Sequence, residues 1–199
     1  MIRVACMSIQ NKRVLQSTLF LLTLCTSSGV LASVSAPLNF EANVVKVACE
    51  LSVSQSQIKF DTVMTNEIKP QTLLRTRDFI LNISRCNAVD GEDNITPKLK
   101  VSGSGFSTLD GKWLFKTQDS PVKNMGFLLY HSDTPPTYSD SSLNNNDIID
   151  YHQTYKVSTL NLDTPFYAMI ACGDNETCDK AKTETGTLKA VVSFDLLYD

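Results

Sequence analysis

Residues 186–199 constrain the fold more than any other segment, because apolar side chains occupy every second position there up to the end of the chain. The segment begins at Gly186, and its alternating apolar residues are Leu188, Ala190, Val192, Phe194, Leu196 and Tyr198. Successive side chains of a β-strand point to opposite faces, so the pattern predicts a strand over residues 188–198 with one buried face. The simplest interpretation is a paired strand of a self-contained domain.

The N-terminus has the pattern of a secretory signal peptide. Basic residues Arg3, Lys12 and Arg13 precede the apolar run 19–24, and small residues follow it. The run is shorter than the roughly 18 apolar residues of a membrane-spanning helix. We expect cleavage after Ala32, within a window of about residues 28–36, and therefore an exported mature chain that does not span the membrane.

The mature chain is expected to be acidic and to form one domain. The whole chain carries 18 Lys+Arg against 21 Asp+Glu, and residues 1–32 contain three of the basic residues and none of the acidic ones. The remainder has a net charge of −6, which offers no electrostatic basis for binding nucleic acid. Its length suits a single domain, predicted as residues 44–199 behind an N-terminal extension, residues 33–43.

Four cysteines remain after the predicted cleavage, because Cys6 and Cys25 leave with the signal peptide. An even number of cysteines in an exported chain indicates disulfides, and four of them allow three pairings. We pair near neighbours in the sequence. The alternative is a four-cysteine metal site, but the spacing lacks the paired C-x2-C motifs of zinc sites. The predicted bonds are Cys49–Cys86 and Cys172–Cys178.

Nearly every segment of the body has the composition of a strand bounded by turn residues, and no sustained helical period is present. The sequence therefore predicts an all-β fold, a two-sheet sandwich of immunoglobulin type. The lone tryptophan, Trp113, is expected to pack in the core. The expected strands cover residues 44–53, 78–86, 96–101, 113–116, 125–131, 155–160, 166–172 and 188–198.

The chain resembles the pilin subunits of chaperone–usher fimbriae, specifically those of the type 1 fimbria-like kind. The resemblance rests on residues 38–49, on Cys86 closing a strand, and on the tail, where Gly186 and the penultimate Tyr198 bracket the alternating apolar positions. It implies an incomplete immunoglobulin-like sandwich that lacks its last strand and is completed by a donor strand. The residues implied to bind the chaperone or the next subunit are Gly186, Leu188, Ala190, Val192, Phe194, Leu196 and Tyr198.

The same resemblance implies a function and a set of partners. The chain is expected to be a structural subunit of a fimbria that supports cell adhesion. Its implied partners are a periplasmic pilus chaperone, an outer-membrane usher and other pilin subunits, and its route runs through the periplasm to the cell surface. Assembly would proceed by donor-strand complementation and exchange, in which an extended segment adds to an open sheet edge. No cofactor, metal or catalytic residue is expected, and the chain is not expected to be an enzyme.

The extension 33–43 is the expected donor segment. Its apolar residues alternate with others, as a groove-filling strand requires, and they are Val34, Ala36, Leu38 and Phe40. Pro37 lacks the N–H that a strand ladder uses. The extension is also short and contains no glycine between Ser33 and Asn43. These departures suit a minor subunit, a terminal subunit or an earlier cleavage site.

The alternative function is a self-contained secreted adhesin or carbohydrate-binding module. The polar stretch 133–153 could form a binding surface at one end of the sandwich. Aromatic side chains stack on sugar rings, so a host glycan or receptor is a further candidate partner. The candidate sugar contacts are Tyr130, His131, Tyr138, Tyr151 and His152.

Overall fold

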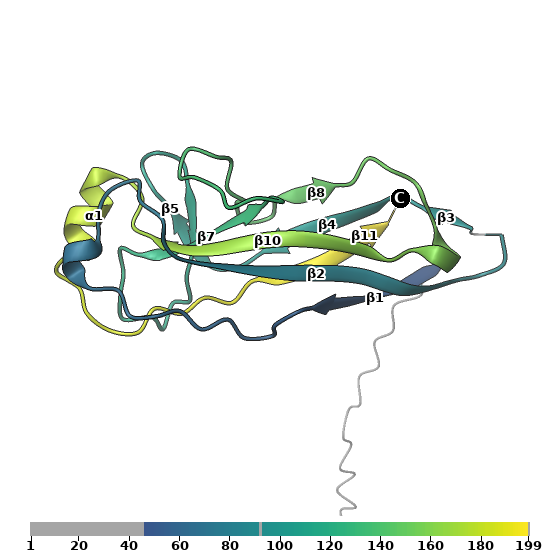
Figure 1. Cartoon of the computed structure of the whole chain (residues 1–199), viewed down its shortest axis with the longest axis horizontal. Coiled ribbons are helices and arrows are strands. Elements are labelled where there is room, and N and C mark those ends of the chain that lie inside the picture. Colours follow the sequence, from purple (N-terminus) through teal and green to yellow (C-terminus); the bar gives the residue numbers. More distant parts are fainter. Residues whose placement is uncertain (1–45, 92, 199) are drawn as a thin grey trace, which may run out of the picture. The chain divides into compact units, whose positions relative to one another are not determined.

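The computed structural model describes residues 46–91 and 93–198 (Figure 1). The chain divides into two units, residues 1–42 and 43–199. The predicted signal peptide and the predicted donor residues Val34, Ala36, Leu38 and Phe40 lie outside the described residues. The fold below is that of the second unit.

The described chain forms two main antiparallel sheets and a small third one. The larger sheet has six strands in the order β1-β2-β10-β7-β6-β5, and the smaller has the order β11-β4-β8. The short strands β3 (Asn94–Ile95) and β9 (Tyr155–Lys156) pair with each other. The main strands are β1 (Val47–Val53), β2 (Leu74–Ala88), β4 (Pro97–Ser102), β5 (Gly105–Ser107), β6 (Trp113–Phe115), β7 (Gly126–His131), β8 (Ile148–Asp150), β10 (Leu162–Ala171) and β11 (Ser193–Tyr198).

The main core lies between these two sheets. Alternate residues of β2, β10 and β4 point into it, as the two-residue period of a strand requires. Leu81 and Ile83 of β2, Phe166 of β10, and Leu99 and Val101 of β4 are fully buried there. The all-β sandwich predicted from the sequence is therefore confirmed.

A second apolar cluster covers the outer face of the six-stranded sheet. Its buried members include Leu128 and Tyr130 of β7 and Met169 of β10, and Tyr138 from the long polar stretch packs against them. Both faces of β7 and β10 are thus covered, which explains why these strands have long apolar runs rather than a strict alternation.

One helix departs from the expectation of an all-strand body. The helix α1 (Asn175–Ala181) follows β10 and lies between Cys172 and the tail, where the sequence indicated no helical period. The Asp174 carboxylate accepts a hydrogen bond from the Thr177 N–H at 3.0 Å and so caps the helix. Burial opposes ionisation of Asp174, but hydrogen bonds from Thr177 and Leu109 outweigh it and lower the pKa of the carboxyl to about 2. No helix of the described residues is long and apolar enough to cross a membrane.

Several predicted boundaries were wrong. The terminal strand β11 begins at Ser193 rather than at residue 188, and only β9 of the predicted strand 155–160 is extended, because η2 (Val157–Thr159) is a 3-10 turn. Three short strands, β3, β5 and β8, were not predicted. Each contains only two or three residues, too few to show an alternating pattern, and tertiary pairing defines them.

Candidate functional site

A groove of about 1150 Å³ lies between two irregular segments. Each segment is continuous in the chain with the edge strand of a sheet but is not itself a strand. Residues 54–63, here called the β1 rim, follow β1, and residues 184–192, called the β11 rim, precede β11. β1 and β11 are edge strands of different sheets, so the groove follows one side of the sandwich. Its apolar floor includes Phe79, Phe115, Val122, Met125, Phe127, Leu129, Ala168 and Ile170.

The two rims are bonded to their outer neighbours and not to each other. Ser54 N–H donates to the Ile80 carbonyl at 2.8 Å, and Thr117 N–H donates to the Lys189 carbonyl at 2.9 Å. No backbone hydrogen bond joins one rim to the other among the residues that the structure describes. The backbone edges that face the groove are therefore available to a further extended segment.

The alternating apolar residues of the tail share one face, as the sequence predicts, but that face is less buried than expected. The apolar set is more buried than the residues between it, since Val191 on the opposite face is 67% exposed. None of the set is fully buried, however, although the pattern predicts a buried face. The open groove is the physical reason for Leu188, Ala190, Val192 and Phe194, which line it. Leu196 and Tyr198 are also half-buried, but they lie beyond the groove.

An aromatic cluster anchors the tail to the core. The Phe194 ring lies 5.2 Å from Phe166 and 6.1 Å from Phe79, centroid to centroid, in tilted and edge-on arrangements. These geometries are the favourable ones for ring pairs. On the opposite rim the Phe60 ring lies 4.9 Å from Phe127. The β1 rim and the strand β11 are thus both attached to the core by aromatic side chains.

The penultimate tyrosine closes the sandwich at the end beyond the groove. Cys49 N–H of β1 donates a hydrogen bond to Tyr198 Oη of β11 at 3.0 Å. This contact joins the two edge strands directly, through a side chain, where no ladder connects them. The phenol of Tyr198 thus reaches from β11 to the β1 backbone, between two strands that share no backbone hydrogen-bond ladder.

Gly186 marks the point where the chain enters the β11 rim. Its φ of +138° lies in a region that favours glycine, and an added Cβ would lie 2.6 Å from Pro121 Cγ. Any other residue would therefore be both strained and too close to the proline. The glycine allows the tail to turn closely past this residue before it runs along the groove.

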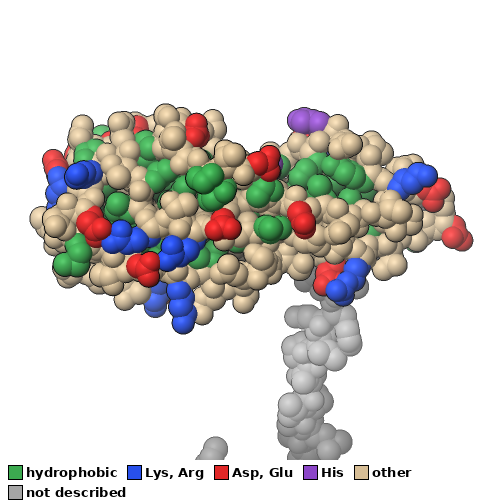
Figure 2. All heavy atoms as spheres, in the orientation of Figure 1, with side chains coloured by type: hydrophobic (Ala, Val, Ile, Leu, Met, Phe, Trp, Pro, Cys, Tyr) green, Lys and Arg blue, Asp and Glu red, His purple; other side chains and the backbone are tan. Residues whose placement is uncertain are grey.

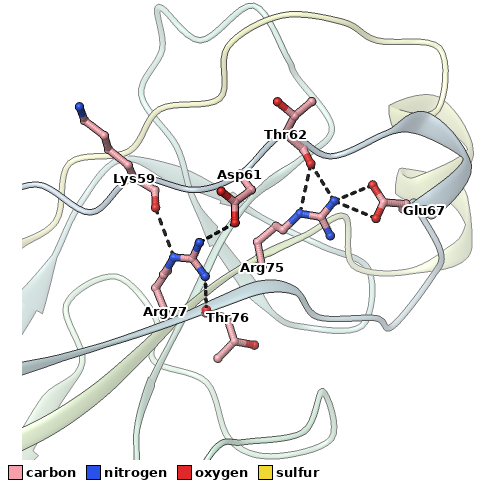
Figure 3. A network of polar contacts seen from close by, with 7 residues as sticks. All are labelled: Lys59, Asp61, Thr62, Glu67, Arg75, Thr76 and Arg77. Carbon is pink, nitrogen blue, oxygen red and sulfur yellow. Dashed lines mark hydrogen bonds and ion pairs between the residues drawn. The ribbon is translucent and has the colours of Figure 1, made fainter.

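Two arginines of β2 hold the β1 rim in place (Figure 3). Arg75 donates from Nε and Nη2 to the Thr62 carbonyl at 3.1 and 2.7 Å, and from Nη2 to Glu67. Arg77 Nη2 donates to Asp61 at 2.6 Å. The hydrogen bond from Arg75 is the main cause that lowers the pKa of Glu67 below its ordinary 4.5. The ion pair therefore stabilises the fold at neutral pH and is lost as the pH falls through that lowered value.

Arg75→Ala is expected to weaken binding of an inserted strand about three- to tenfold, because the rim loses its fixed position while its apolar contacts remain. Arg85→Ala is the matched control. Arg85 lies on the same strand, also has a positive φ, and pairs with Glu50 away from the groove. Titration of each variant with a labelled strand peptide measures the effect, and equal affinities for the two variants would contradict the role given to Arg75.

Both predicted disulfides are present. Cys49 bonds to Cys86 between the paired strands β1 and β2, and Cys172 bonds to Cys178 across the start of α1. The first bond adjoins the Tyr198 contact, so it fixes the end of β1 that holds the tail. The described residues contain no group of three or more His, Cys, Asp or Glu that could hold a metal ion.

The five candidate sugar contacts do not form one surface. Tyr130 is 1% exposed, and burial, followed by the nearby Asp140 and Asp110, raises its phenol pKa to about 12. Tyr138 packs on the same cluster and donates to Asp110 at 2.7 Å, while Tyr151 bonds to Thr164 Oγ1 at 2.6 Å beside the main core. His131 and His152 remain exposed. The stretch 133–153 covers a sheet rather than forming a rim of stacked aromatics.

The β1 rim and its arginines were not predicted as part of a site. Residues 54–63 are mostly polar, with only Ile58, Phe60 and Val63 partly buried, and the short alternation of Ile58 and Phe60 was the one signal available. The direction of Arg75 depends on its φ of +56° at an irregular point of the β2–β10 ladder. Such a bulge re-aims a side chain, and no pattern of residue types marked it.

The sequence matches no family model and no curated protein at a significant level. Solved structures do match. A chaperone–usher pilus whose structure reveals the molecular basis of rod uncoiling has 14% identity and a TM-score of 0.52, with 83% of this chain and 96% of that chain covered. At this identity the match shows a shared fold, in agreement with the incomplete immunoglobulin-like sandwich predicted from the sequence.

Two further matches have lower TM-scores. The P pilus rod subunit PapA is 13% identical over 76% of this chain and 99% of its own, with a TM-score of 0.49. The CupB6 tip adhesin from Pseudomonas aeruginosa is 10% identical over 75% of this chain and 41% of its own, with a TM-score of 0.42.

Proposed function

We propose that the chain is a pilus subunit whose groove receives an extended strand from another protein. The observation that carries the proposal is the pair of unbonded rims facing each other across an apolar floor. A strand lying between them would bond to both backbones and would place alternate side chains on the floor. It would also cover the half-buried face of the tail, which is otherwise exposed apolar surface beside an open edge.

The proposed order of partners begins with a periplasmic chaperone and continues at an outer-membrane usher with the next subunit. The groove would first hold the chaperone's strand and then the extension of another pilin. Residues 1–32 would serve as the export signal and residues 33–43 as this chain's own donor segment. The subunit would reach the cell surface as part of a fimbria and would support adhesion, as a minor or terminal component.

The main test is co-expression of the chain with a pilus chaperone from the same operon. A stoichiometric complex with the chaperone, and aggregation or degradation of the chain expressed alone, is the expected result. Exposed apolar surface in the empty groove is the physical reason. A stable soluble monomer that does not bind the chaperone would overturn the proposal and would favour the self-contained adhesin.

A deletion separates the two roles proposed for the chain. Removal of residues 33–43 is expected to preserve chaperone capture, because the groove is intact, and to prevent the chain from entering the groove of another subunit. Cross-linking of subunits in purified fimbriae measures this. If the deleted chain is still incorporated with its neighbours on both sides, the extension is not the donor.

A further inference from the structure

A second hollow, of about 510 Å³, lies beside β5, the edge strand at the opposite end of the six-stranded sheet from β1. It shares no lining residue with the groove. The two sites back onto each other, since a Cβ at Gly103 would lie 2.7 Å from the Val191 carbonyl oxygen of the β11 rim. A ligand here and a strand in the groove can therefore be bound at the same time.

Two aromatic side chains, Phe106 and Trp113, give this pocket its apolar surface. Trp113 was predicted to be a core residue; it packs against the core and also lines the pocket. Its ring lies edge-on to Phe115 at 6.4 Å, and an added Cβ at Gly105 would lie 2.8 Å from its Nε1. Close packing on the inner side therefore holds the indole in one orientation.

The polar side chains of the pocket are two amides, two lysines and the hydroxyl of Ser104. Lys116 and Lys123 line it, no carboxylate does, and neither lysine forms an ion pair within the described part of the chain. The chain as a whole has a net charge of −3. On the face shown in Figure 2, by contrast, acidic and basic side chains are interspersed. Glu184 accepts a hydrogen bond from the Lys123 N–H at 2.7 Å but is not among the lining residues. Two lysines with no carboxylate in the lining favour an anion in the pocket.

The two amides complete the set of donors. Asn145 Oδ1 accepts a hydrogen bond from the Gly103 N–H at 3.0 Å, which leaves its NH2 group to donate. Gln118 also lines the pocket and is exposed. An aromatic surface, two amides and two lysines around one hollow match a ligand that has an apolar face, hydroxyl groups and a negative charge.

We propose that this pocket binds an acidic sugar, a pyranose ring whose C–H face packs on the aromatic surface of Trp113 and Phe106. Its carboxylate or sulfate group lies near Lys116 and Lys123, and its hydroxyls bond to Asn145 and Gln118. The proposal does not depend on the function of the groove, because the pocket is lined by other residues.

The test uses the single tryptophan of the chain. The full chain is labelled with ¹⁵N-tryptophan, so one indole N–H resonance reports on the pocket. An unlabelled peptide of residues 33–43 is added to fill the groove and keep the protein from aggregating. 3′-Sialyllactose, 3′-sulfolactose and neutral lactose are titrated separately. We expect a saturable shift of the resonance with at least one acidic sugar, and binding of lactose about tenfold weaker or less. The first two probes distinguish a carboxylate from a sulfate.

Charge removal locates the binding site. The double variant Lys116→Gln with Lys123→Gln is expected to weaken the acidic sugar about tenfold, while Lys156→Gln, an exposed lysine on β9, leaves its affinity unchanged. Three outcomes would overturn the proposal: no response to either acidic sugar, equal affinity for lactose, or unchanged affinity in the double variant.

Discussion

Val192→Asp is expected to reduce capture of an inserted strand by about a hundredfold or more, whereas Val191→Asp leaves capture nearly unchanged. Val192 is half-buried, packs against the core and lines the groove. A carboxylate there would be enclosed by apolar atoms once a strand covers it, and burying an unpaired charge costs several kcal/mol. Val191 is the same residue type one position earlier. It is also among the residues that line the groove, but its side chain is 67% exposed, so a carboxylate there stays in water.

The pair of variants separates strand binding from folding. Neither position belongs to a strand ladder, since β11 begins at Ser193, so both variants are expected to form the Cys49–Cys86 bond. Co-purification with the chaperone measures capture, and thiol titration together with circular dichroism measures folding. Normal capture of Val192→Asp would mean that the tail does not contact the inserted strand, and the groove would lose its assigned role.

The tail could be predicted from sequence because one physical constraint acts on it throughout. Residues 188–192 keep the alternation although they are not in a ladder, since their apolar side chains still face the floor of the groove. The same pattern therefore identified the half-buried face of the tail correctly and placed the start of the strand too early. Exposure depends on side-chain direction, whereas a strand boundary depends on backbone partners.

The opposite rim could not be predicted in the same way. Residues 54–63 are held by Arg75 and Arg77 from a strand that follows them in the chain, and those bonds exist only after β2 is in place. Trp113 is a similar case. An isolated tryptophan in an apolar run indicates core packing, and only the approach of Gly105 and Asn145 from other segments makes it part of a pocket. Sites built from several segments leave little signal in any one of them.

Loss of the Cys49–Cys86 bond is the second large expected effect. Cys49→Ser with Cys86→Ser should lower the free energy of unfolding by about 4 kcal/mol, and Cys172→Ser with Cys178→Ser by about 2 kcal/mol. The difference follows from loop-closure entropy, because the first bond spans a sequence separation of 37 and the second a separation of 6. Urea unfolding of each variant with the groove filled by peptide measures both values, and a larger loss for the short loop would contradict the assignment.

The longer loop also bears on assembly. Its disulfide fixes the end of β1 where the Cys49 N–H bonds to Tyr198 Oη, so the bond supports the contact that closes the sandwich beyond the groove. A domain with an open groove buries less apolar surface and is expected to have a low free energy of unfolding. A loss of about 4 kcal/mol is a large part of the 5–15 kcal/mol free energy of unfolding that is typical of small domains. Expression in a reducing compartment is therefore expected to yield chain that captures no strand, while the Cys172→Ser, Cys178→Ser variant, exported normally, still does. Strand capture by fully reduced protein would show that the edge strands β1 and β11 keep their positions without the disulfide.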